Sequence, residues 1–260
     1  MTQLSKLSLL LLVLCALSGV ACDDSSSSPT DAGSDGDAWH TDDADTNGPD
    51  GDADVDGDGD ADADGDTEVD ADVERSAQLT IPASDPRIHY TGRFDQSTPD
   101  APVCSWSACA ATIWVDAQSV SVRVSDSAGN NIVNVVIDGG EPRVVDLQAG
   151  NNEIVVAEDL ELGRTHRIQI YRRTEAFFGE ITLGDWTLGD TLPPQNPPAQ
   201  DREVVVVGDS ITCGYGIEGT SHDCEFSAET ENAYLTYGAL LARRFGADYT
   251  AIAWSGKGMY

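Results

Sequence analysis

The chain has 260 residues and a formal net charge of −32, from 14 Lys and Arg against 46 Asp and Glu. This balance excludes a protein that binds nucleic acid or anionic membranes through its surface, because both functions need clustered cations. Of the 46 acidic residues, 21 lie between residues 23 and 74, where there is no Lys or Arg. About 185 residues follow this segment, which is long enough to bury a core.

Residues 1–22 have the pattern of an export signal. Lys6 precedes a leucine-rich apolar stretch, and small residues lead up to Cys22. Because about eleven apolar residues are too few to span a bilayer permanently, we expect this segment to be removed. The residues before Cys22 resemble the lipoprotein box of bacteria, although Gly19 stands where that box prefers Leu. We expect an exported, membrane-anchored protein with a lipid on Cys22, and secretion after cleavage behind Ala21 is the alternative.

Residues 23–75 are predicted to be a disordered acidic tether. They contain almost nothing apolar, so folding cannot offset the ordering entropy, and like charges extend the segment. Two stretches, Asp52–Gly57 and Asp60–Gly65, match the first half of an EF-hand calcium loop. The twelfth position of that loop should be Glu, but it is Ala63 or Ala71. We therefore expect loose cation uptake here and no specific calcium site.

Residues 76–192 change to apolar–polar alternation with a period of two, which is typical of half-buried strands. Clusters of Gly, Asn and Asp separate the alternating stretches and predict turns. About eight strands at this spacing predict a β-sandwich or jelly roll. The expected strands include residues 120–124, 132–137, 143–147, 153–156, 167–171 and 180–183.

A proline-rich linker at 193–200 separates this domain from residues 201–260, which follow an α/β pattern. Glu203–Val207 is a continuous apolar run, as expected for a strand that is buried on both faces of a parallel sheet. Residues 230–245 have helical spacing and residues 248–254 form the next strand, which together make a βαβ unit. The fold class is therefore mixed, with a sandwich followed by an α/β segment.

Candidate catalytic residues follow the two strands of this unit. In an open parallel sheet, the carboxyl ends of adjacent strands border a ligand crevice, so Ser210 and Gly256 should lie at the same edge. A nucleophilic serine there has a backbone N–H free to bind an oxyanion, and Gly256 allows a second N–H to approach. A serine at the end of a strand is also a common cap or turn residue, so the residues alone leave both interpretations open.

Five motifs point to a known family. Gly208–Gly216 resembles the first sequence block of the SGNH hydrolases, also called GDSL esterases. Thr230–Tyr237 and Ser255–Gly258 are similar to carbohydrate esterase family 2, the acetyl-xylan esterases. Ile88–Asp95 and Arg172–Ala176 resemble the N-terminal jelly roll of the same family. The resemblance therefore covers both predicted domains.

The resemblance implies a serine esterase that removes acetyl groups from polysaccharides such as xylan and needs no cofactor. It implies that Ser210 is the nucleophile, that the Ser210 and Gly256 amides form the oxyanion hole, and that Asp209 supports the first block. The family pattern continues with Gly-x-Asn-Asp and late Asp-x-x-His blocks, and neither is found after Ser210. We therefore expect residues 201–260 to be the start of a three-layer SGNH domain in a C-terminally truncated chain. Without the catalytic His, this chain should have little activity.

Four cysteines remain once those of the signal and the lipid site are set aside. In an exported protein, their even number and close spacing predict the disulfides Cys104–Cys109 and Cys213–Cys224. The second disulfide would hold the loop after Ser210 beside it. His222 lies in that loop and is therefore the alternative candidate for the base.

The sequence gives little support for a metal or phosphate site. The sequence has no zinc-ligand spacing, and no Gly-Lys-Ser/Thr follows the glycine-rich loop, which argues against a phosphate site. Four aromatic residues, Tyr90, Trp106, Trp114 and Trp186, offer a sugar-binding face, although core packing explains most of them. The alternative function is thus a glycan-binding surface lipoprotein with an inert hydrolase remnant. The expected partners are an acetylated polysaccharide and, through the lipid anchor, a membrane, and not nucleic acid.

Overall fold

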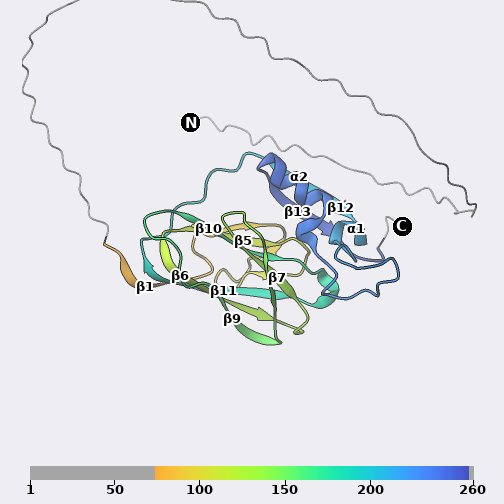
Figure 1. The fold of residues 1–260 in the computed structure, drawn as a ribbon, viewed down its shortest axis with the longest axis horizontal. Coiled ribbons are helices and arrows are strands. Elements are labelled where there is room, and N and C mark those ends of the chain that lie inside the picture. Colours follow the sequence, from red (N-terminus) through yellow and green to blue (C-terminus); the bar gives the residue numbers. More distant parts are fainter. Residues whose placement is uncertain (1–73, 258–260) are drawn as a thin grey trace, which may run out of the picture. The chain divides into compact units, whose positions relative to one another are not determined.

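The computed structural model describes residues 74–257, in which two antiparallel sheets are followed by a short parallel sheet (Figure 1). The predicted export signal, the lipid site at Cys22 and almost all of the predicted tether lie outside the described residues. Within the described part, the helices are too short or too polar to cross a membrane.

The first sheet has six strands, in the order β3-β4-β11-β6-β9, with β1 also paired to β11. The strands are β1 (Ser76–Ile81), β3 (Phe94–Asp95), β4 (Val103–Cys104), β6 (Ala117–Asp126), β9 (Gly150–Ala157) and β11 (Ile181–Thr191). All pairs are antiparallel, and the register of β11 against β6 shifts between Leu183 and Trp186. A shift of this kind bends the long strand β11, as β-bulges do.

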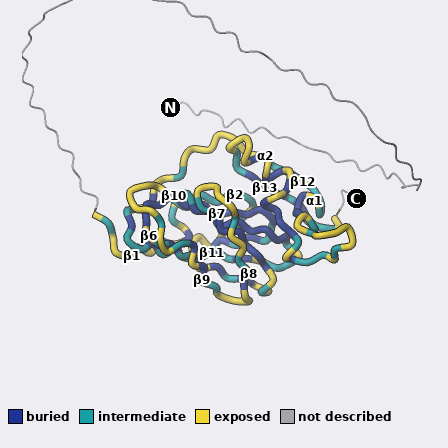
Figure 2. The backbone as a smooth tube through the Cα atoms, in the orientation of Figure 1, coloured by how far each residue is buried: buried dark blue, intermediate teal, exposed yellow. Residues whose placement is uncertain are grey.

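The second sheet has five antiparallel strands in the order β2-β5-β10-β7-β8. They are β2 (His89–Thr91), β5 (Ala110–Val115), β7 (Ile132–Ile137), β8 (Arg143–Asp146) and β10 (His166–Arg172). Apolar side chains from the facing sides of both sheets form one core. The buried residues of the strands are dark blue in Figure 2. Its members include the fully buried Trp186 and Leu188 on β11 and Ile168 on β10. The predicted β-sandwich is confirmed.

The third sheet pairs β12 (Glu203–Gly208) with β13 (Asp248–Ala253) in parallel. The helices near it are α1 (Ser210–Cys213), the 3-10 helix η2 (Ala233–Leu235) and α2 (Tyr237–Phe245), and η1 (Ala176–Phe178) lies between β10 and β11. The long helix therefore begins at Tyr237, and the predicted start near Thr230 is wrong. The reason is local, because the side chain of Asn232 caps the Tyr234 N–H and the Ala233 N–H donates to the Arg173 carbonyl, which holds this stretch against the sandwich.

A second core joins the parallel sheet to the outer face of the second antiparallel sheet. Val136 and Tyr171 from the sandwich pack in one cluster with Tyr234, Ala242 and Tyr249. Strands β5, β7 and β10 are consequently buried at nearly every position and not only at alternate ones. The sandwich and the α/β segment thus form one compact unit of the chain.

Candidate active site

The carboxyl ends of β12 and β13 lie side by side, since Gly208 pairs in register with Ala253. Ser210 follows the first strand and begins α1, where it is half-buried. Gly256 follows the second strand and is exposed. The structure therefore brings the two predicted oxyanion donors to one edge of the sheet.

Asp209 holds the start of α1. Its side chain accepts a hydrogen bond from the Ile211 N–H at 3.1 Å, which is the geometry of a helix N-cap. Gly214 ends the helix with a φ of 89°, and a Cβ there would collide with the backbone of Asn232. The loop after β12 is thus held at both ends, by the Asp209 cap and by the close packing of Gly214 on the backbone of Asn232. The role of Asp209 is to stabilise this loop conformation.

Gly256 has a φ of +73°, in the left-handed region that favours glycine. A Cβ at this position would meet no atom within 4 Å, so the glycine is needed for its backbone conformation and not for space. The turn is closed by the Lys257 N–H, which donates to the Trp254 carbonyl at 3.2 Å.

No imidazole among the described residues contacts the Ser210 side chain. His222 is 91% exposed and pairs with Asp223 at 3.3 Å. His89 and His166 bind Asp248 and Asp138, at 2.9 and 2.8 Å. Within the described part of the chain, no histidine is therefore hydrogen-bonded to Ser210 as a general base.

The two predicted disulfides have different outcomes. Cys104 and Cys109 are bonded, which confirms the first. The second is wrong, because Cys213 and Cys224 are both free thiols. Cys213 is buried on α1, where its thiol donates to Glu175 at 3.6 Å, while the thiol of Cys224 donates to the Glu225 carbonyl. Burial and the nearby Glu175 raise the pKa of the Cys213 thiol well above its usual range, so Cys213 is an inert, protonated group.

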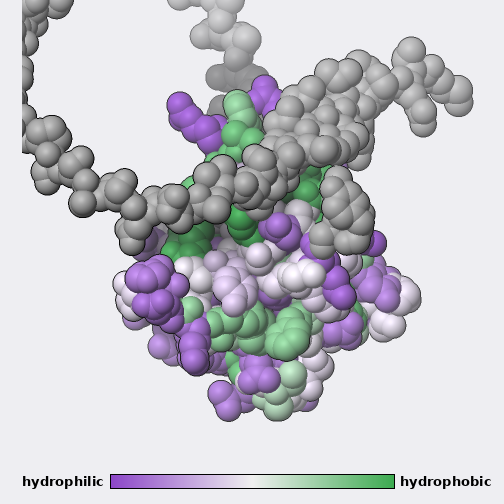
Figure 3. Space-filling model, turned by 90° about the vertical axis from the view of Figure 1, so that its right-hand side faces the viewer, coloured by the Kyte–Doolittle hydropathy of each residue, from purple (hydrophilic) through white to green (hydrophobic). Residues whose placement is uncertain are grey.

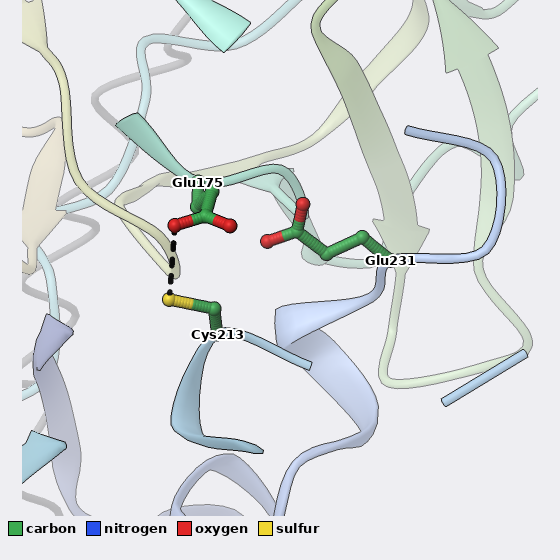
Figure 4. A group of neighbouring side chains, drawn as sticks. All are labelled: Glu175, Cys213 and Glu231. Carbon is green, nitrogen blue, oxygen red and sulfur yellow. Dashed lines mark hydrogen bonds between the residues drawn. The ribbon is translucent and has the colours of Figure 1, made fainter. Parts of the chain in front are cut away.

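Two carboxyl groups that the sequence analysis missed lie under these loops (Figure 4). Glu175 and Glu231 are fully buried, and one carboxyl oxygen of each lies with the Cys213 sulfur within 4.8 Å of one another. One oxygen of Glu175 accepts the Ser255 N–H at 2.7 Å. Burial and then the neighbouring Glu175 raise the pKa of Glu231 to about 9.

This donor set favours protons over a metal ion. The Cys213 thiol is protonated and already donates to Glu175. Two guanidinium groups, of Arg172 and Arg173, supply positive charge to the Glu231 carboxyl. A divalent cation at this place would have to displace the thiol proton, and it would be repelled by the positive charges of the two guanidinium groups.

Two adjacent buried arginines have different partners: Arg172 binds within the sandwich, and Arg173 binds the α/β segment. Arg172 is fully buried and donates to four backbone carbonyls, those of Cys104, Thr174, Glu175 and Gly179. Burial lowers the pKa of its guanidinium to about 10.

Arg173 crosses to the α/β segment. It donates to the carbonyls of Glu231 and Glu229 at 2.8 and 2.9 Å and pairs with the Glu218 carboxylate. The motif that begins at Arg172 and the motif at residues 230–237 therefore bind each other.

Aromatic residues of both parts meet beside the site. Trp106, in the loop that the disulfide closes, packs edge-on against Trp254 with ring centroids 6.4 Å apart. Tyr215 stacks on Phe226, with ring centroids 4.2 Å apart. Of the aromatics considered for a sugar-binding face, Trp186 is a core residue.

Residues 90–198 match the family model of the carbohydrate esterase 2 N-terminal domain. This chain belongs to carbohydrate esterase family 2. The sandwich is therefore the N-terminal domain of that family, and the parallel sheet resembles the start of its hydrolase domain.

The curated relatives extend well beyond the part that this chain matches. The cellulase/esterase CelE of Acetivibrio thermocellus is 34% identical over 175 residues, which are 67% of this chain and 21% of CelE. An acetylxylan esterase/glucomannan deacetylase of Cellvibrio japonicus is 28% identical over 184 residues, 71% of this chain and 51% of the enzyme. The chain thus spans about half of the latter enzyme and a smaller share of CelE.

A solved structure supports the fold of both parts. The family two carbohydrate esterase from Clostridium thermocellum, in complex with cellohexaose, is 34% identical and has a TM-score of 0.62. The match covers 66% of this chain and 52% of that structure.

Proposed function

We propose that this protein is a serine esterase that removes acetyl groups from a polysaccharide such as xylan. The observation that carries the proposal is the parallel register of β12 and β13, which brings Ser210 and Gly256 to one edge of the sheet. The family relation supports the reaction class, because the curated relatives include acetylxylan esterases.

The roles of the residues follow from the chemistry of ester hydrolysis. The Ser210 hydroxyl oxygen attacks the acetyl carbon and loses its proton to a base, and the carbonyl oxygen becomes an oxyanion. The Ser210 and Gly256 N–H groups stabilise this oxyanion, and the sugar oxygen leaves with a proton. Water then attacks the acetyl-serine and releases acetate.

The test is acetate release from acetylated xylan by the protein expressed from its complete reading frame. We expect Ser210→Ala to lower kcat by on the order of 10⁴-fold or more, since the covalent step is lost. Ser221→Ala, which changes an exposed serine of the following loop, is the matched control and should leave the rate unchanged. Equal rates for Ser210→Ala and the wild type would contradict the proposal.

A glycan-binding protein without turnover is the second candidate, favoured by the lack of any imidazole contact to Ser210 in the described part of the chain. Calorimetric titration with acetylated xylan separates the two, if it is done on the protein expressed from its complete reading frame. Binding without acetate release, unchanged by Ser210→Ala, supports this second candidate.

We also propose that the protein is exported and held at a membrane by a lipid on Cys22. The Cys104–Cys109 disulfide supports export, because such bonds persist in oxidising compartments. Cys22→Ala should move the protein from the membrane pellet to the soluble fraction after ultracentrifugation. An unchanged distribution would contradict the anchor.

A further inference from the structure

One carboxylate oxygen contacts both loops of the candidate active site. Glu175 Oε2 accepts the Ser255 N–H at 2.7 Å, directly before Gly256. The same oxygen accepts the Cys213 thiol at 3.6 Å, at the end of the short helix that begins with Ser210. Glu175 itself belongs to the segment between β10 and η1 of the sandwich. A residue of the N-terminal domain therefore connects the ends of β12 and β13.

We propose that Glu175 is a positioning residue that holds the two loops so that the Ser210 and Gly256 N–H groups converge on one oxyanion. The proposal rests on the proposed esterase function and extends it to a role of the sandwich in catalysis. Oxyanion stabilisation depends on donors placed in advance, and a misplacement of about 1 Å can cost on the order of 10²-fold in rate.

The surroundings of Glu175 leave its carboxylate little freedom. Its side chain is fully buried, and Arg172 donates to the carbonyls of Thr174 and Glu175 at 3.0 and 2.7 Å. Thr174 in turn donates to Asn131 at 2.8 Å. The backbone that carries Glu175 is therefore fixed to the sandwich on both sides, as a positioning group requires.

The charges around the cluster also favour Glu175 as the acceptor. Glu231 faces it, and burial raises the pKa of Glu231 to about 9, so this neighbour is uncharged at neutral pH. The guanidinium groups of Arg172 and Arg173 face the same cluster. An N–H donates more strongly to a carboxylate than to a neutral oxygen.

The experiment measures the two loops directly in the 260-residue chain. Amide hydrogen exchange reports on Ser255 and Gly256, and alkylation by iodoacetamide under native conditions reports on the Cys213 thiol. We expect Glu175→Ala to accelerate both by about tenfold or more, because each loop loses its buried acceptor. Glu175→Gln keeps an acceptor oxygen and should restore values to within about threefold of the wild type. Glu180→Gln, on an exposed residue of the same connection, is the control.

A third variant keeps the proposal testable if Glu175→Ala does not fold. Glu175→Asp keeps the charge but withdraws the oxygen by one methylene group, so we expect faster exchange at Ser255 than in Glu175→Gln. In the protein from the complete reading frame, Glu175→Asp should lower kcat with KM unchanged.

Protection at Ser255 and Cys213 that is equal in the wild type, Glu175→Asp and Glu175→Ala would overturn the proposal, as would equal kcat. The exchange and alkylation measurements do not depend on turnover. A failed esterase assay with a normal exchange pattern therefore counts against the proposed function and not against the contacts of Glu175.

Discussion

The sandwich and the α/β segment bury their apolar residues in different ways. In the sandwich, the facing sides of two sheets supply a shared core around Trp186 and Leu188. The parallel sheet has two strands, and its buried residues pack mainly on the outer face of the second sandwich sheet. On the molecular face drawn in Figure 3, hydrophobic surface is exposed between hydrophilic regions. Exposed apolar side chains of the α/β segment include Val207, Ile211, Leu240 and Phe245.

The α/β segment therefore depends on the sandwich for its core. Two strands and one two-turn helix are too little to be stable alone. Loss of the Arg173 or Glu175 contacts should therefore destabilise the α/β segment and leave the sandwich folded. The dependence can be tested by changes in the sandwich, in the cluster between the two parts, and outside both.

The largest expected effect is that of Arg173→Met. Arg173 is 2% exposed, and its loss leaves the Glu229 and Glu231 carbonyls and the Glu218 carboxylate without their donor. Each buried carbonyl that loses its donor costs about 1–3 kcal/mol. The Glu218 side chain is 36% exposed, so its carboxylate stays partly hydrated and adds less. We expect limited proteolysis to cut within residues 203–257 first, while the sandwich remains intact.

Arg123→Met is the matched control for this change. Its side chain is 68% exposed and pairs with Asp185 on the first sheet at 3.4 Å, so we expect a loss of less than about 1 kcal/mol. If Arg173→Met opened both parts together, at equal rates, the α/β segment would not be the dependent part.

The next effect depends on pH. Burial raises the pKa of Glu231 from 4.5 to about 9 in the folded protein. The folded state therefore holds this proton more tightly than the unfolded state, so its stabilising contribution is complete below pH 4.5 and is lost as the pH rises towards 9. The loss amounts to about 1.4 kcal/mol per pH unit inside this window.

Urea unfolding of the wild type and of Glu231→Gln at several pH values measures this loss. The difference between their free energies of unfolding should shift by about 3 kcal/mol between pH 5 and pH 7 in favour of Glu231→Gln. Glu225→Gln changes an exposed carboxyl nearby and should show no such shift. A difference that stays constant with pH would show that Glu231 does not titrate as expected.

The sandwich was predictable because its strands carry local signals. Strand β7 agrees with the predicted bounds 132–137, and β6 extends the alternation seen at residues 120–124. The strands β3 and β4 were missed, because two residues each are too short for a period to show. The edge that joins Ser210 to Gly256 was predictable from the parallel βαβ pattern alone.

The cluster beneath that edge was not predictable in the same way. Glu175 and Glu231 are distant in the sequence and meet only through the packing of the two parts. Both lie in motifs that the family resemblance had singled out, and this was the available signal. The Cys213–Cys224 prediction failed because cysteine spacing does not show that Cys213 points to a buried carboxylate.

A smaller effect is expected within the sandwich itself. Cys104 and Cys109 close a loop with a sequence separation of 5, and the chain-entropy model gives roughly 2 kcal/mol for such a short loop. Replacing both by Ser should lower the free energy of unfolding by that amount, and Trp106 should lose its contact with Trp254. Cys224→Ser is the control, since this thiol is free. Equal stabilities of both variants would contradict the prediction.

The smallest effect is expected for deletion of residues 23–73. These residues hold most of the acidic excess and almost no apolar side chains, so they have little surface to bury on either part of the fold. The deletion keeps Arg75, which binds Asp116 and Asp190 at 2.9 and 3.1 Å and ties the first strand to the sandwich. We expect the melting temperature, measured by calorimetry at 0.15 M salt, to stay within about 2 °C of the wild type, because long-range charge repulsion is screened there.

Arg75→Ala in the deleted chain is the positive control, since it should lower the melting temperature visibly where the deletion does not. A fall of several degrees on deletion alone would mean that the acidic segment contributes to the stability of the folded unit, against the prediction that it is only a tether.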